Sequence, residues 1–383
     1  MAPREMPPPL RQVAADPARR LAAPLHAALF GRPFDAGRAR RLLVLFEPRR
    51  IAYASVHPFL AHAGAFAARH DAQIRLLPTG TALARGLPRG LSRPTHVLAQ
   101  TWLTDPPERH AAVAALLAAL PDGTVTAYLD SSANADIRLA RPFRAVDLYF
   151  KKALFADRAA HLRPTRGHTN LTEYYGDRLG PPQPRTDWQV PAEMLPRLRL
   201  APGFLTAPAL ARGFLRRAAP PRGPRPIDLH ARLGGTGAEG WYGAMRRAAE
   251  AAARAVPGMR IVTGTGVPRR RFLAELRGSK LCFSPFGYGE LCWRDIEAIL
   301  AGAVLLKPDM RHLDTAPPLY RDGETYVALR WDFADLAETA AALLTDAERR
   351  DRLSRAAYAA ARSYLENDGP AETYAPLFEQ GPT

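Results

Sequence analysis

A loop with two glycines leads into a helical pattern and then into an apolar run at residues 284–309, which read SPFGYGELCWRDIEAILAGAVLLKPD. Gly287 and Gly289 have no side chain, so the backbone of this loop can approach a ligand closely. The predicted helix ends at Gly302, and its free N–H groups carry a partial positive charge that suits phosphate. The segment therefore predicts a loop–helix–strand unit that binds a phosphate-bearing ligand, with a nucleotide as the natural candidate.

Two faces can be assigned to the predicted helix. Arg294 and Glu297 are three residues apart and so lie on one face, available to polar ligand groups. Trp293, Ile296 and Leu300 form an adjoining apolar face that can pack against the rest of the domain. One face is therefore expected to pack while the other binds.

The same stretch resembles the C-terminal domain of group 1 glycosyltransferases of the GT-B fold. After a predicted strand at 303–306, residues 319–327 (LYRDGETYV) are similar to the turn and strand that the family writes as dG.tgllv. Residues 331–364 match the remaining family pattern of an aspartate followed by helices. The resemblance covers about residues 229–364 and is architectural only in the N-terminal half. It implies a nucleotide-sugar donor bound by the second domain.

One departure from the family pattern concerns its paired glutamates. Retaining members usually carry two glutamates separated by seven residues; the second position is Glu297 here, but the first falls on Gly289. The nearest acid, Glu290, is one residue out of register, so retention and inversion both stay open. The resemblance implies that Glu297 receives the ribose hydroxyls of the donor. The alternative is a helix glutamate that makes only a surface ion pair.

Strand and helix patterns alternate along the whole chain, which predicts parallel, doubly wound sheets. The expected fold class is α/β, with two Rossmann-like domains that face a cleft, as in GT-B proteins. Prolines recur from residue 180 to 226 and mark a boundary between the domains. The expected segments are a basic, proline-rich and partly mobile lead (1–40), an acceptor domain (41–180), a proline-rich linker (181–225), a nucleotide-sugar domain (226–346) and C-terminal helices that cross back (347–383). The first domain's expected strands are 41–46, 74–77, 96–100, 125–129 and 147–150, with helices at 57–69 and 108–120.

Polar side chains at strand ends supply the remaining donor-site candidates, because ligands of open parallel sheets bind beyond the carboxyl ends of the strands. Arg232 follows the first strand of the second domain, and its forked guanidinium suits a phosphate. Ser284 opens the glycine loop, and Lys307 ends an apolar strand in a chain with few lysines. Arg294 is the strongest basic candidate, since it shares a face with Glu297. The alternatives are a surface arginine for Arg232, a snorkelling lysine for Lys307 and a local salt bridge for Arg294.

The acceptor side offers three candidates for the base that removes a proton from the acceptor in an inverting transfer. They are Asp130 at the end of a predicted strand, His57 in the early loop–helix region and His168 in the sequence RGHTN. A lone histidine is more often structural. No Asp-x-Asp triplet and no histidine pair with zinc-ligand spacing occurs, so we expect no metal and no cofactor beyond the nucleotide-sugar substrate.

Charge and composition limit the partners. The 383 residues carry a net charge of +16, but only four of the 53 basic residues are lysines, and the 49 arginines are scattered through every segment. This pattern favours anionic sugar phosphates and an anionic membrane surface, and we expect no nucleic-acid partner. Cys282 and Cys292 are the only cysteines, and no apolar run spans a bilayer. We therefore expect a cytoplasmic protein with peripheral contact to the inner membrane.

The combined prediction is a metal-independent glycosyltransferase that moves a sugar from a nucleotide-activated donor to a glycan or lipid-linked acceptor. Two alternatives stay open. One is a non-catalytic GT-B scaffold in glycan assembly, suggested by the missing glutamate. The other is a sugar-nucleotide isomerase or phosphorylase-like enzyme that uses the same fold with different chemistry.

Overall fold

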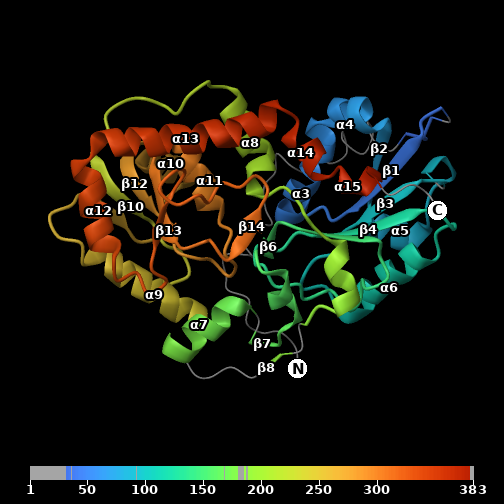
Figure 1. The fold of residues 1–383 in the computed structure, drawn as a ribbon, viewed down its shortest axis with the longest axis horizontal. Helices are drawn as coiled ribbons and strands as arrows, with labels where there is room; N and C mark the ends of the chain where they lie inside the picture. The colour runs from blue at the N-terminus through green and yellow to red at the C-terminus, as the bar shows by residue number, and fades with distance from the viewer. Residues whose placement is uncertain are drawn as a thin grey trace.

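The computed structural model describes residues 32–379 except 36, 92, 168, 180–184 and 187–188. Two α/β units lie side by side, and each is built on a parallel sheet flanked by helices (Figure 1). The expected α/β class with two Rossmann-like domains is confirmed. Most of the proline-rich lead expected at the start of the chain lies outside the described residues.

The first sheet has the strand order β2-β1-β3-β4-β5-β9, and every neighbouring pair is parallel. Its strand β1, an interior strand next to β2 at one edge, carries the apolar run LLVLF, whose side chains are buried on both faces. Leu42 and Val44 pack in one core cluster, whereas Leu43 and Leu45 pack in another. Helices cover both faces of the sheet, so both sets of β1 side chains are buried. This explains why apolar and polar residues do not alternate along β1. The strands are β1 Arg40–Phe46, β2 Ala72–Pro78, β3 His96–Ala99, β4 Val125–Asp130, β5 Leu148–Lys151 and β9 Leu198–Leu200.

The helices of the first unit differ from the prediction in one place. The single helix expected at 57–69 is wrong: α3 begins at Arg50, and the chain leaves the helical conformation at His62, where ψ is 25°, before α4 begins. Asp71, in the left-handed conformation, ends α4. The helices of this unit are α3 Arg50–Ala61, α4 Ala63–His70, α5 Thr79–Arg85 and α6 Pro107–Ala118. Two further helices, α7 Asn170–Leu179 and α8 Pro208–Leu215, pack their buried side chains in the core of the second unit. Short strands β7 Thr165–Arg166 and β8 Arg185–Thr186 pair with each other.

The second sheet has the order β11-β10-β12-β13-β15, again with all neighbours parallel. Gly302 ends α11 with a φ of 74°, as expected for a glycine that stops a helix and releases the chain into the next strand. The strands are β10 Ile227–Ala231, β11 Ile261–Thr263, β12 Ser279–Phe283, β13 Val304–Pro308 and β15 Val327–Leu329. The helices are α9 Gly240–Arg254, α10 Arg269–Arg277, α11 Trp293–Ala301 and α12 Leu336–Thr345.

The C-terminal helices connect the two units. The long helix α13 (Ala347–Glu366) runs along the second unit, and α14 (Gly369–Thr373) and α15 (Pro376–Glu379) then lie on the first (Figure 1). The Tyr374 ring lies 4.4 Å from that of Phe59, and Phe378 lies 5.9 Å from Phe66, measured between ring centroids. The end of the chain therefore packs into the core of the domain in which the chain begins.

The two units also meet at the carboxyl ends of their sheets. Strand β14 (Leu313–Thr315) pairs antiparallel with β6 (Ala153–Phe155). Beside this pair, the glycine loop touches the loop that follows β4: Leu291 N donates to the Ala133 carbonyl at 3.2 Å. A Cβ placed on Gly289 would lie 2.4 Å from the Asn134 nitrogen. The missing side chain at Gly289 is thus required by the approach of the other domain.

Replacing Gly289 by alanine should lower the free energy of unfolding by about 1–3 kcal/mol, because the added methyl group overlaps the backbone of the first unit. Urea denaturation measures the change. Gly237→Ala is the matched control, since no atom lies within 4 Å of the Cβ position there. Equal stability of the two variants would show that the loop and the first unit are not held in this contact.

Candidate functional site

Strands β10, β11, β12 and β13 all end at the same edge of the second sheet, because they are parallel. The loops that follow them bring predicted residues from distant parts of the chain to this edge. Arg294 on α11 donates from Nη2 to the carbonyl oxygen of Arg232 at 2.5 Å. Arg232, Arg294 and Glu297 are therefore neighbours on one edge, as the convergence of the loops predicted.

Arg232 is already engaged by a carboxylate. Its Nε and Nη2 both donate to the carboxylate of Glu275 on α10, each at 2.8 Å, and its Nη1 donates to the carbonyl of Thr263. The hydrogen bonds from Arg232 are the main reason that the pKa of Glu275 is lowered, with Arg271 adding to the effect. The guanidinium of Arg232 is thus held rigidly with its charge largely compensated. Its predicted contact with a donor phosphate stays a prediction.

Arg294 is placed differently. It is partly buried, and its one side-chain hydrogen bond within the described part of the chain joins Nη2 to a neutral carbonyl. Its Nε is buried without a hydrogen-bond partner. Within the described part of the chain, no carboxylate forms an ion pair with this guanidinium. Arg294 therefore keeps both an uncompensated charge and a free donor, which is the state expected of a side chain that awaits an anionic ligand.

Glu297 lies in the wall of the site rather than on an open surface. Its side chain is 6% exposed and accepts a hydrogen bond from Arg269 Nη2 at 2.5 Å, while Arg269 itself is 55% exposed. Glu297 therefore does form an ion pair, which was the alternative to a ligand role, and its partner is Arg269, the first residue of α10. The role of Glu297 toward a ribose stays a prediction, and a ligand that takes it must share the carboxylate with Arg269 or displace it.

His230 is a site residue that sequence reasoning missed. It is fully buried near the end of β10, with its ring edge-on to Phe272 and both ring nitrogens without a hydrogen-bond partner. Burial, reinforced by the charges of Arg294 and Arg232, lowers the pKa of His230 to about 4. The ring is consequently neutral at physiological pH and retains unused hydrogen-bonding capacity beside the arginine cluster.

The start of α11 is organised by Asp295, another residue missed by sequence reasoning. Its carboxylate accepts hydrogen bonds from Ser284 Oγ at 2.6 Å and Tyr320 Oη at 2.8 Å, and Lys307 Nζ lies 3.1 Å away as an ion-pair partner. It also accepts from the backbone N–H of Cys292, which precedes the helix. The anion at the N-terminus of this helix is thus the protein's own carboxylate.

The burial of this cluster bears on two predicted donor contacts. Ser284 and Lys307 are both 0% exposed and turn toward Asp295. In this conformation Ser284 donates a hydrogen bond to Asp295 and Lys307 forms an ion pair with it. Their roles as phosphate ligands therefore stay predictions. Gly287 N donates to the Gly289 carbonyl at 2.9 Å, which closes the glycine loop on itself. A signal for Asp295 was present in the sequence, since an acid at the third position of a helix commonly caps its start.

The acceptor-side candidates lie in separate environments. Asp130 is buried and ion-paired with Lys151 at 2.9 Å, and it accepts a hydrogen bond from Tyr149. Burial alone would raise the pKa of Asp130, but Lys151 and the hydrogen bonds from Ser132 outweigh it and lower the pKa. His57 Nδ1 contacts the carbonyl of Thr206 at 2.8 Å. His168 lies outside the described residues. Each assignment as a base stays a prediction.

Two buried acids, Glu290 and Asp136, lie where the two units touch. Glu290 Oε2 accepts a hydrogen bond from the Ala135 N–H at 3.1 Å, whereas its Oε1 has no hydrogen-bond partner and lies 3.8 Å from His312 Nε2. Asp136 accepts from the backbone N–H of Asn170. Burial, followed by the nearby charge of Glu290, raises the pKa of Asp136 to about 7.

Among residues 32–379, outside the gaps named above, no cluster of three or more His, Cys, Asp or Glu could hold a metal ion. Within the same part of the chain, no helix has the length and apolar character needed to cross a membrane.

Comparison with known proteins identifies the fold. No protein-family model and no curated protein matches the chain. An alpha-glucosyltransferase in complex with UDP and a 13-mer DNA containing a HMU base has a TM-score of 0.50 and 10% identity, over 90% of this chain and 100% of that chain. HepE of Anabaena in complex with UDP has a TM-score of 0.43 and 10% identity, over 89% and 98%. At 10% identity the likeness to the alpha-glucosyltransferase concerns the fold alone, and it confirms the expected GT-B arrangement.

The Asp136 carboxyl makes the stability of the protein depend on pH. Because the folded state raises its pKa from 3.8 to about 7, the folded state holds the proton more tightly than the unfolded chain. Its contribution is present at low pH and is lost as the pH rises through about 7. Asp136→Asn cannot titrate, so its stability should fall less than that of the wild type between about pH 5 and about pH 8.

Urea denaturation at the two pH values measures this difference. Asp122→Asn, which changes an exposed aspartate in a turn, is the control and should follow the wild type. Parallel pH profiles for wild type and Asp136→Asn would show that Asp136 keeps an ordinary pKa.

Proposed function

We propose that this protein is a glycosyltransferase that binds a nucleotide-activated sugar at the carboxyl edge of its second sheet. The observation that carries the proposal is Arg294, a partly buried guanidinium with an unpartnered Nε at the edge where nucleotides bind in Rossmann-like sheets. Support comes from the fold, which is shared with an alpha-glucosyltransferase solved with UDP. Membership of the group 1 family is part of the proposal.

Charge at this edge suits a diphosphate. Among the described residues, Arg232, Arg269, Arg271 and Arg294 meet two carboxylates, those of Glu275 and Glu297. The excess of two positive charges matches the two negative charges of the diphosphate in a nucleotide-sugar, to which the departing oxygen adds one more. Since Asp295 occupies the start of α11, guanidinium groups rather than the helix N-terminus supply most of the stabilisation in this account.

The proposed reaction breaks the bond between the anomeric carbon and the diphosphate oxygen, which keeps the electron pair. A new bond forms between the anomeric carbon and an acceptor hydroxyl oxygen, and the hydroxyl proton passes to a base. Arg294 holds the leaving diphosphate, and Glu297 holds the ribose. Asp130, His57 and His168 remain the candidates for the base, and the stereochemical outcome is left open. The transfer is proposed to need no metal, because arginines neutralise the leaving group.

The first domain is proposed to hold a glycan or a lipid-linked acceptor, in the cytoplasm and at the periphery of the inner membrane. We propose no nucleic-acid partner, because the 49 arginines and four lysines are spread along the chain and are not gathered in one segment of the sequence. The DNA in the alpha-glucosyltransferase complex is a partner of that protein and is not proposed for this chain. A non-catalytic scaffold is the second candidate, favoured by the burial of Lys307 and Ser284 against Asp295.

Replacing Arg294 by alanine should weaken binding of a nucleoside diphosphate about 10- to 100-fold, the effect of removing one charge-assisted hydrogen bond. Binding of the nucleoside alone should not change. Calorimetric titration with UDP, GDP, ADP and CMP first identifies the base, and the matching nucleoside is then compared. Arg277→Ala, at the far end of α10, is the control. Equal losses for nucleotide and nucleoside would contradict the role of Arg294.

Replacing Glu297 by glutamine should weaken binding of the ribonucleotide, because a carboxylate accepts hydrogen bonds from ribose hydroxyls more strongly than an amide does. The 2′,3′-dideoxy form of the same nucleotide should bind wild type and variant alike. Titration calorimetry with both ligands tests this, and the Tm checks that the variant is folded. A similar loss for both ligands would mean that Glu297 acts through Arg269 and not through the ribose.

A further inference from the structure

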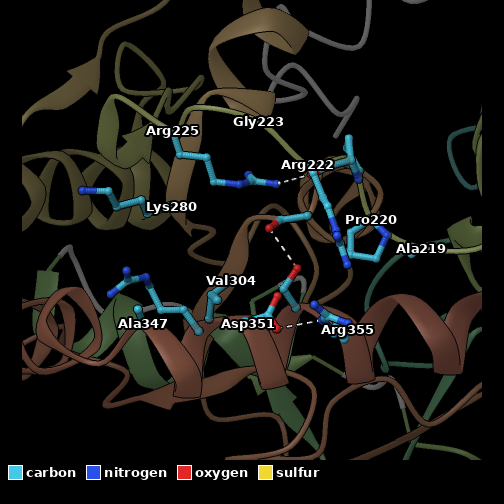
Figure 2. Close-up of a pocket in the computed structure, with 14 residues that line it drawn as sticks. Ala219, Pro220, Arg222, Gly223, Arg225, Lys280, Val304, Ala347, Asp351 and Arg355 are labelled. Atoms are coloured by element: carbon cyan, nitrogen blue, oxygen red, sulfur yellow. Dashed lines mark hydrogen bonds and ion pairs between the residues drawn. The ribbon is translucent and has the colours of Figure 1, made fainter.

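A pocket of about 360 Å³ opens at the opposite edge of the second sheet (Figure 2). Lys280 at the beginning of β12 and Val304 at the beginning of β13 form part of its wall. The rest comes from the segment 219–225 and from the first turns of α13. The nucleotide site proposed above lies beyond the carboxyl ends of these same strands. The pocket is therefore a separate site, and its volume is in the range of small-molecule sites.

The lining of the pocket is strongly basic. Its basic members are Arg222, Arg225, Lys280, Arg350 and Arg355, and its acidic member is Asp351. Two of these charges are compensated: Lys280 pairs with Asp228 at 2.7 Å, and Arg355 pairs with Asp351 at 2.7 Å. In Figure 2, Arg222 and Arg225 come from the segment above the pocket, whereas Asp351 and Arg355 come from α13 below it. The remaining basic side chains of the pocket are those of Arg222, Arg225 and Arg350.

Two of the three are fixed in the wall by neutral partners. Arg225 donates to the carbonyls of Ser279 at 2.6 Å and Ala301 at 2.9 Å, and also to that of Pro221. Burial lowers the pKa of Arg225, but an arginine remains charged in proteins. Arg350 Nη1 donates to the carbonyls of Leu343 and Leu344 at the end of α12. Carbonyl dipoles orient these guanidiniums without cancelling their charge.

The third arginine, Arg222, lies at the rim of the pocket. Arg222 is exposed, and its side chain makes no hydrogen bond or ion pair with the described residues of 32–379. The pocket thus combines two fixed cations with one that is free to close on a ligand. A concave site lined by one sign of charge concentrates ions of the other sign. Three uncompensated guanidiniums exceed what a single carboxylate would need and match the forked oxygen geometry of a phosphate.

We propose that this pocket binds a phosphate group carrying at least two negative charges, at a site separate from the nucleotide. The phosphate belongs either to a soluble phosphorylated molecule or to a phospholipid headgroup, and the chemistry of recognition is the same for both. A feature that suits a lipid source precedes the pocket segment 219–225 in the sequence: Leu215 at the end of α8 is 46% exposed and is followed by Arg216 and Arg217. The proposal does not depend on the glycosyltransferase assignment.

The first test is calorimetric titration with inorganic pyrophosphate. It is performed on Arg294→Ala protein, in which the proposed nucleotide site is weakened. Adding Arg222→Glu should lower the affinity for pyrophosphate at least about tenfold, as expected from losing a charge-assisted contact and gaining repulsion. Lys280→Gln is a second pocket variant, and Arg85→Ala, an exposed arginine on α5 in the first unit, is the control.

The second test separates the two sources of phosphate. The full chain is sedimented with vesicles of phosphatidylcholine alone and with vesicles that also contain phosphatidic acid, whose phosphomonoester headgroup can carry two negative charges. A headgroup site predicts binding to the anionic vesicles that Arg222→Glu reduces and Arg85→Ala does not. A site for a soluble phosphate predicts that only the pyrophosphate titration responds to Arg222→Glu. If neither probe responds to Arg222→Glu or Lys280→Gln, the pocket is not a phosphate site and the proposal is overturned.

Discussion

The buried carboxylate of Asp295 is the interaction on which the candidate site depends. It joins Ser284 after β12, Lys307 on β13 and Tyr320 further along the chain to the first turn of α11. Removing one partner of such a pair leaves an uncompensated buried charge, which typically costs about 3–5 kcal/mol. The network fixes where α11 starts and how it is rotated. Its neighbours Arg294 and Glu297 are consequently held toward α10 and the edge of the sheet, where they meet Arg232 and Arg269.

The glycine loop has a second constraint, which comes from the other domain. Gly289 lies against the backbone of Asn134, and the carboxylate of Glu290 accepts the N–H of Ala135. The same loop therefore carries the helix of the proposed donor site and the contact with the first unit. The loop thus joins the contact between the two units directly to the start of α11. The raised pKa of Asp136 makes that contact sensitive to pH as well.

Sequence alone predicted the α/β class, most strands of both sheets and the convergence of Arg232 and Arg294, because apolar runs and strand ends are local signals. Strand β9, which lies in the segment expected to be a proline-rich linker, was not predicted. It did not predict the partners. Arg269 and Glu297 are 28 positions apart, and Arg232 and Glu275 are 43 apart, so no periodicity connects them. The approach of Gly289 to a ligand stays a prediction, and the structure adds a backbone contact with the first unit that no sequence pattern indicated. Periodicity identifies the face of a helix but not the group that it meets.

The central claim is that a nucleotide binds at the carboxyl edge of the second sheet. Hydrogen–deuterium exchange on the full chain, with and without the nucleotide selected by titration, tests it most directly because exchange locates the site by peptide. The account predicts protection in the loops after β10, β11 and β12, at residues 232–240, 264–268 and 284–292, with the segment 219–225 unchanged. Protection confined to other regions, or none with any of the four nucleotides, would contradict the account.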